Sequence, residues 1–121
     1  MKRDMDLVRM ILLRVEAAET TGLSVSGLAL DDYDSSTVAR HIELLDEAGF
    51  VEAALLRGGG EIVGAQIQRL TWAGHDFLDA VRDDTTWQKT KQQVATVVGS
   101  ASLEVIKAVA TATTMRALGL G

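Results

Sequence analysis

The sequence has no cysteine and no proline, and only 4% of its residues are aromatic. Without cysteine the chain has no disulfide, no thiol nucleophile and no thiolate metal ligand. Without proline, nothing forbids long helices. No uncharged apolar run approaches the roughly 20 residues that a membrane span needs, and the start does not resemble a signal peptide. We therefore expect a cytoplasmic protein that makes no contact with a membrane.

What the sequence contains is ordinary for one globular domain with a helical appendage. Of its 121 residues, 47% are hydrophobic and 24% are charged. The net charge of −5 counts against nonspecific attraction to DNA, which depends on Lys and Arg neutralising phosphates, although local patches matter more than the sum. Catalytic and metal-binding groupings are also lacking, so we expect no enzyme activity, no cofactor and no metal.

The N-terminal third predicts one helix and a weakly patterned connection. Residues 5–19 place Val8, Ile11 and Leu12 at helical spacing, and Asp4 can cap the start. Residues 20–33 contain two glycines and leave room for one helical turn at most. Leu28 and Leu30 could form a short strand there.

The most informative segment begins at Asp34. Either Asp34 or its neighbour Ser35 can cap a helix over residues 35–48. Gly49 stands where a left-handed residue ends such a helix, and Phe50 can fold back onto its last turn. Residues 51–56 and 61–70 predict two strands joined by a glycine-rich tip. A helix followed by such a hairpin is typical of the recognition helix and wing of a winged helix.

The fold class predicted is α+β, mostly α. Residues 1–84 are expected to form a winged-helix-like domain of a helix, a short strand, a recognition-type helix and a two-stranded wing. Residues 85–121 are expected to form a C-terminal helical extension. The glycine-rich tip is not a phosphate loop, because no GK[ST] sequence follows and no helix begins there.

The outward face of helix 35–48 carries the residues that would read DNA. The N-terminal part of a recognition helix meets base edges, and the tip of a wing meets the backbone. The candidate nucleic-acid contacts are therefore Ser36, Thr37, Arg40, His41 and Arg57. Glu43 and Glu47 share this face and would repel phosphates, so an ordinary solvated surface stays equally open.

Thr71 is expected to cap a helix over residues 72–82, with Trp72 anchored against the wing. His75 has the carboxylates of Asp76 and Asp79 nearby. One histidine beside carboxylates is too little for a zinc site, so we expect a structural histidine.

The C-terminal segment predicts helices over residues 87–98 and 100–118, the latter capped by Ser100. The last helix is apolar on most of its circumference, and its only charged residues are Glu104, Lys107 and Arg116. Such a helix must be buried on several sides. A homodimer through the C-terminal helices would bury it, and so would a helical hairpin packed on its own domain.

Three stretches carry a family resemblance: MKRDMDLVRMIL, HIELLDEAGFVEA and LTWAGHDFLDAVRDDTTW. They resemble the bacterial and phage family called domain of unknown function 2513, from Met1 to about Trp87. The resemblance implies a winged-helix-like fold and an origin in a phage or other mobile element, and it transfers no catalytic residue. STVARHIELLDEAGFV is also similar to the recognition helices of small bacterial winged-helix regulators.

Two functions follow from this. The first is a dimeric regulator that binds double-stranded DNA, and the second is a winged helix that docks a host or phage protein. A continuous positive strip across Arg40, His41 and Arg57 would favour DNA. An acidic surface there would favour protein docking.

Overall fold

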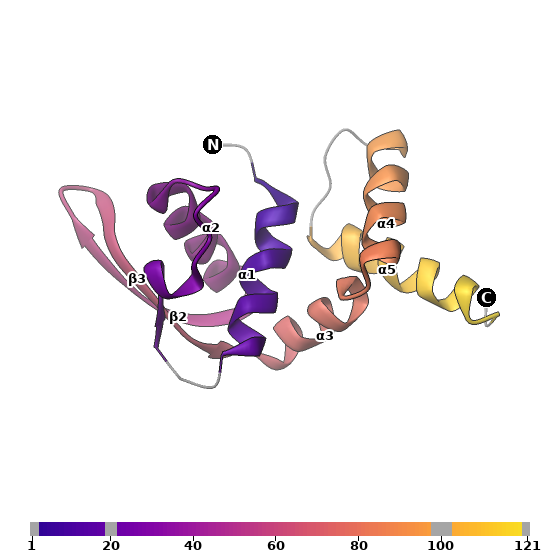
Figure 1. Ribbon diagram of the computed structural model, residues 1–121, viewed down its shortest axis with the longest axis horizontal. Coiled ribbons are helices and arrows are strands. Elements are labelled where there is room, and N and C mark those ends of the chain that lie inside the picture. The colour runs from indigo at the N-terminus through magenta and orange to yellow at the C-terminus, as the bar shows by residue number, and fades with distance from the viewer. Residues whose placement is uncertain (1–2, 19–21, 98–102, 120–121) are drawn as a thin grey trace. The chain divides into compact units, whose positions relative to one another are not determined.

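The computed structural model describes residues 3–18, 22–97 and 103–119 (Figure 1). In chain order the elements are α1 (Met5–Ala17), β1 (Leu23–Ser24), the 3₁₀ helix η1 (Ser26–Leu28), α2 (Ser35–Glu47), β2 (Val51–Gly58), β3 (Glu61–Leu70), α3 (Trp72–Val81), α4 (Asp84–Val97) and α5 (Leu103–Ala117). This confirms an α+β chain that is mostly helical. None of the described helices is long and apolar enough to cross a membrane.

The chain divides into two compact units, Met1–His75 and Asp76–Gly121. The division falls inside α3, whereas the sequence suggested a domain boundary after residue 84. The assignment of residues 85–121 as an oligomerisation element stays a prediction. Each unit is described here by itself.

The core of the first unit is formed by the apolar faces of two helices and by the sheet. The fully buried side chains of α1 are Leu7, Ile11 and Leu12, and those of α2 include Ile42. As expected, Asp4 caps α1, because its Oδ1 accepts a hydrogen bond from the Leu7 amide at 3.1 Å. The helix ends at Ala17, earlier than the sequence suggested, and residue 19 lies outside the described residues.

A three-stranded antiparallel sheet has the order β1-β3-β2. The expected short strand at Leu28 and Leu30 is wrong, because the strand that pairs with β3 is Leu23–Ser24. Leu28 instead ends η1, and Ala29 with φ of 54° turns the chain so that Leu28 and Leu30 are buried. In the described part of the connection between α1 and α2, residues 22–34, the single turn of η1 is the only helical element, as the sequence predicted.

The end of α2 is the expected glycine stop. Gly49 has φ of 79° and donates to the Asp46 carbonyl, and the Phe50 amide donates to the Leu45 carbonyl at 3.0 Å. This pair of bonds is a Schellman motif. At the other end Asp34 occupies the N-cap position, but its side chain makes no capping hydrogen bond, so that expected contact is absent.

The hairpin of β2 and β3, which we call the wing, matches the two predicted strands closely. β2 and β3 pair from Val51↔Leu70 to Gly58↔Glu61, and the turn consists of Gly59 and Gly60, both with positive φ. Positive φ at both central residues is what a type I′ hairpin turn requires. The register shifts between Leu56 and Arg57, so that β3 contributes one extra residue at this point.

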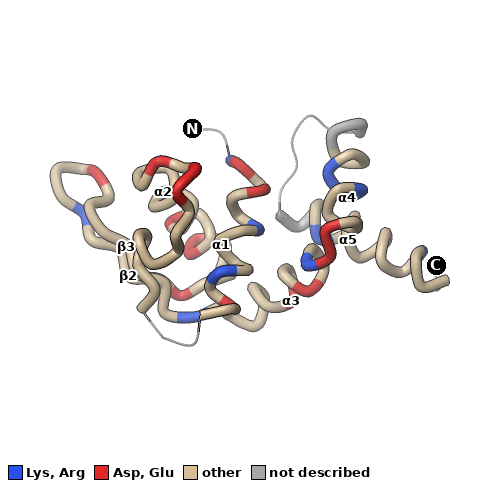
Figure 2. Tube along the Cα trace, in the orientation of Figure 1, with Lys and Arg blue, Asp and Glu red and all other residues tan. Residues whose placement is uncertain are grey.

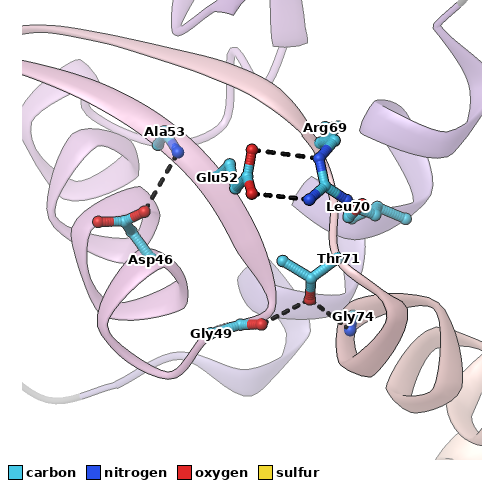
Figure 3. Close-up of polar contacts among 8 residues, drawn as sticks. All are labelled: Asp46, Gly49, Glu52, Ala53, Arg69, Leu70, Thr71 and Gly74. Carbon is cyan, nitrogen blue, oxygen red and sulfur yellow. Dashed lines mark hydrogen bonds and ion pairs between the residues drawn. The ribbon is translucent and has the colours of Figure 1, made fainter.

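The first turn of α3 closes onto the end of α2 at a tight junction, which we call the corner and define by Gly49, Phe50, Thr71 and Gly74 (Figure 3). The Thr71 hydroxyl donates to the Gly49 carbonyl at 2.5 Å and accepts from the Gly74 amide at 3.1 Å, which confirms the Thr71 cap. A Cβ at Gly74 would lie 2.0 Å from the Phe50 carbonyl oxygen. The corner therefore has no room for a side chain at Gly74.

The expectation that Trp72 anchors α3 against the wing is wrong. Its side chain is 84% exposed. The buried side of α3 is the stripe of Gly74, Phe77, Leu78 and Val81, which recur at helical spacing. Trp72 lies two residues before Gly74, about 200° around the helix, and so points away from that stripe.

In the second unit α4 and α5 pack against each other. Their buried residues include Trp87, Thr90, Ile106, Ala110 and Thr113, and each threonine hydroxyl donates to a carbonyl one turn earlier in its own helix. The helix α4 begins at Asp84, before the expected residue 87, because Asp83 Oδ2 accepts from the Thr86 amide at 2.8 Å and caps it. Ser100, the expected cap of α5, lies outside the described residues.

Candidate functional site

The surface shared by α2 and the wing is centred on one buried carboxylate. Glu43 Oε1 accepts from Arg40 Nη1 at 2.9 Å, and Glu43 Oε2 pairs with Arg57 Nη2. The Glu43 side chain is 8% exposed, whereas those of Arg40 and Arg57 are 54% and 52% exposed. We call Ser36, Arg40, Glu43 and Arg57 the α2–wing surface. The structure thus brings the two arginines of the expected site together.

The two arginines hold Glu43 in its charged form. The hydrogen bond from Arg57 is the main cause that lowers the pKa of Glu43 below its ordinary value of 4.5, and the charges of Arg57 and Arg40 add to it. The carboxylate in turn compensates one of the two positive charges. It also accepts from one nitrogen of each guanidinium, Arg40 Nη1 and Arg57 Nη2, and so takes donors that phosphate oxygens could otherwise use.

His41 lies inside the first unit, so its placement on the outward face is corrected. The side chain is fully buried, its Nε2 accepts from the Asp4 amide at 2.9 Å, and its Nδ1 lies 2.8 Å from the Thr37 carbonyl. Because Nε2 accepts, Nδ1 carries the proton and donates to that carbonyl. His41 therefore joins the start of α1 to α2 and is not available to a base edge.

The remaining expected contacts are near the start of α2. Ser36 is exposed and Thr37 is half-buried. The segment just before the helix is acidic, and its residues Asp31, Asp32 and Asp34 are all exposed. The first unit has seven Lys and Arg against twelve Asp and Glu in its sequence. Figure 2 shows where the acidic and basic residues of the described part lie along the chain. A continuous positive strip across Arg40, His41 and Arg57 is therefore not what this unit presents.

A trough beside these residues was not predicted from the sequence. It is lined by Ser24, Val25 and Ser26 from the connection after α1, by Ser35, Ser36 and Ala39 of α2, and by residues 62–65 of β3. An adjoining hollow shares Val25, Ser26 and Ser35 and continues to Leu30, Asp31 and Tyr33. The concentration of serines on both sides of η1 was the only sequence signal, and it is a weak one.

One aromatic residue, Tyr33, lines the adjoining hollow. Burial first, and then the nearby carboxylates, of which Asp4 acts most strongly, raise the pKa of the Tyr33 phenol above its ordinary value. Negative charge near the phenol disfavours the phenolate. The carboxylates of Asp4, Asp6 and Asp32 therefore favour a positive group near the phenol.

The expected structural role of His75 is also corrected, because His75 is exposed. Asp79 pairs with Arg82 at 2.8 Å, and Asp76 lies 4.0 Å from Lys107. Across the described ranges, no three His, Asp or Glu residues are grouped so that they could hold a metal ion.

Comparison with known proteins assigns the chain to a family. The model of the family described as "Hypothetical protein (DUF2513)" matches residues 2–101. A protein of Haemophilus influenzae described as "Uncharacterized protein" is 39% identical over 111 residues, which cover 91% of this chain and 92% of that protein. No solved structure matches. The chain belongs to the DUF2513 family, as the sequence resemblance suggested, and a phage or mobile-element origin stays a prediction.

Proposed function

We propose that the first unit is a winged-helix-like module that docks a protein partner rather than reading DNA. The element order α1-β1-η1-α2-β2-β3 and the sheet order β1-β3-β2 fit a winged helix in which one 3₁₀ turn replaces the second helix. In that comparison α2 corresponds to the recognition helix and β2–β3 to the wing.

The observation that carries this proposal is the position of Glu43 between Arg40 and Arg57. A carboxylate in the middle of a DNA-reading surface would lie close to phosphates and repel them. While Arg40 and Arg57 pair with Glu43, the cluster carries one net positive charge instead of two, which weakens its attraction for phosphates. A protein surface can instead complement a charge-compensated cluster with polar groups of its own.

Binding to double-stranded DNA is the second candidate, and one observation favours it. The salt bridge from α2 to the wing places both elements on a shared surface, and Ser36 and Arg40 are exposed on the N-terminal part of α2. That is the arrangement by which a winged helix approaches the major groove. The two candidates differ in what they require of Glu43.

Binding of a labelled DNA duplex from the native locus, measured by fluorescence anisotropy at low salt, separates the two candidates. For protein docking we expect no saturable binding by the wild type, and weak binding by Glu43→Gln, which frees two guanidinium groups. Glu47→Gln is the matched control, because it removes the same charge from an exposed position of α2 that contacts neither arginine. Saturable wild-type binding that Arg40→Ala weakens would refute protein docking and support a DNA reader.

We further propose that the chain forms a homodimer through α5. Its exposed residues Val105, Ala108, Ala112 and Met115 recur with the 3-4-3 spacing of a coiled-coil seam, and the alanines would let two helices approach closely. The side of α5 that carries Ile106 and Ala110 is buried. Sedimentation should show a dimer that Met115→Asp dissociates and that Ala117→Asp, an exposed change off the seam, leaves intact. A wild type that is monomeric at all concentrations would contradict this.

A further inference from the structure

One edge of β3 is only partly covered. On the side away from β2, β1 pairs only with Gln66 and Ile67. Toward the tip of the wing, residues 61–65 have β2 on one side and no described strand on the other. In an antiparallel sheet alternate residues direct their N–H and C=O groups to each side, and the pattern is interrupted here only at Val63, the extra residue of β3, so this stretch offers main-chain groups for pairing. At about 3.4 Å per residue it is long enough for a short added strand.

The open edge lies along the trough rather than on a flat surface. Ile62, Val63, Gly64 and Ala65 form one wall, and Ser35, Ser36 and Ala39 of α2 form the other. An added strand would continue the row that β1 begins, because Val25 and Ser26 close that end of the trough. Its side chains would meet the exposed Val63 and the serine hydroxyls of α2. The trough therefore has both a main-chain template and side-chain partners, which strand addition requires.

The charges around the trough decide the chemistry of the segment that would fill it. Asp31 lines the adjoining hollow at the far end of the trough, and the exposed Asp32 and Asp34 lie within three residues of it in the sequence. The half-buried ring of Tyr33 lies at the same end and can face a cation. A positively charged side chain that reaches this end would be attracted by several carboxylates.

We propose that this trough binds an extended peptide segment of a partner protein that carries Lys or Arg side chains, by strand addition to residues 61–65 of β3. This inference rests on the proposed protein-docking function and names where and what the module binds. A second copy of the chain fits the edge less well, because it would bring another acidic unit with Glu61 against the first. A DNA duplex has no strand edge to offer and carries phosphates toward the aspartates.

The test begins with selection of random linear peptides displayed on phage against the full-length protein. We expect the selected sequences to be rich in Lys and Arg. Titration of the isotope-labelled protein with one such synthetic peptide should shift the amide signals of residues 61–65 and of Ser35 and Ser36. Selection of acidic peptides, or shifts confined elsewhere, would overturn the inference.

Variants then locate the site. Ser36→Trp fills the trough from an exposed position and should weaken peptide binding by about tenfold or more. Glu47→Trp adds the same ring to the same helix outside the trough and should leave the affinity within about twofold. Asp31→Asn with Asp32→Asn should weaken binding and flatten its salt dependence. Equal affinity of the Ser36→Trp protein, with an unchanged circular dichroism spectrum, would overturn the inference.

A change in the peptide provides a test that does not depend on how the variants fold. N-methylation of alternate peptide amides removes the donors that strand addition uses, so it should abolish binding in one of the two alternating patterns. Binding that survives both patterns would exclude strand addition. If selected peptides bind but these tests contradict strand addition, the inference about the trough fails and the proposed protein-docking function still holds. Saturable duplex binding by the wild type would instead remove the proposed function itself.

Discussion

The corner lies just beyond the C-terminal end of α2, whereas the α2–wing surface runs along the helix from Ser36 to Glu43, and the two are built in different ways. The corner is fixed by main chain, since Gly74 approaches the Phe50 carbonyl closely and Thr71 bonds to two backbone groups. Nearby, Asp46 also accepts from the Ala53 amide, and Glu52 pairs with Arg69 across the wing (Figure 3). The α2–wing surface is held by long side chains around Glu43.

This difference separates what the fold needs from what binding can use. Backbone contacts leave one geometry, so substitution at the corner should change stability. Arginine side chains have many rotamers and can exchange one partner for another at small cost. Substitution at the α2–wing surface should therefore change recognition more than stability.

The largest effect on stability is expected from Gly74→Ala. The added methyl group would overlap the Phe50 carbonyl oxygen, so α3 must move away from the end of α2. Destabilisation should reach or exceed the roughly 1–3 kcal/mol of ordinary overpacking, as measured by urea unfolding. Gly58→Ala is the control, because its Cβ would meet Val63 at an ordinary 3.4 Å. Similar stability of the Gly74→Ala and wild-type proteins would show that the corner is not rigid.

A smaller effect is expected from Thr71→Val, which keeps the shape of the side chain and removes its hydroxyl. The Gly74 amide loses its capping acceptor and the Gly49 carbonyl loses a donor. The free energy of unfolding should fall by about 1 kcal/mol. Thr85→Val, at an exposed position in the first turn of α4, should change it by less than about 0.5 kcal/mol. Equal effects of the two changes would contradict the role given to Thr71.

The smallest effect on stability is expected at the α2–wing surface, when acid neutralises Glu43. The folded-state pKa of Glu43 is lowered, so its ion pairs stabilise the fold above the ordinary pKa of 4.5 and lose this contribution as the pH falls through the lowered value. The free energies of unfolding of the wild type and of Glu43→Gln, measured over a range of pH, should therefore differ most near neutral pH and converge in acid. A difference that stays constant with pH would mean that the charge of Glu43 does not contribute.

Much of the first unit could be predicted from local signals. The glycine stop at Gly49, the Thr71 cap and the wing with its glycine turn are each encoded within a few residues, and the structure confirms them. The strand near Leu28 and the anchoring of Trp72 were wrong because both depend on packing between segments distant in sequence.

The site was harder to predict than the fold. His41 lies three residues after Val38 and four before Leu45, which is the spacing of one buried helical face. The sequence therefore contained a signal that His41 is buried, but the polarity of histidine led to its prediction as an outward residue. The position of Glu43 between two arginines depends on how the wing bends toward α2, which no spacing in the sequence reveals. The trough combines segments from Ser24 to Ala65 and exists only in the folded chain.

The central claim is that Glu43 is a charged partner of both Arg40 and Arg57 in solution. A carbon-detected NMR titration of the Glu43 carboxyl group tests it most directly. We predict a midpoint below the ordinary 4.5 that rises when Arg57 is replaced by Ala, since Arg57 is the largest cause of the lowered pKa. A midpoint at or above the ordinary value in the wild type, unchanged by Arg57→Ala, would contradict the account.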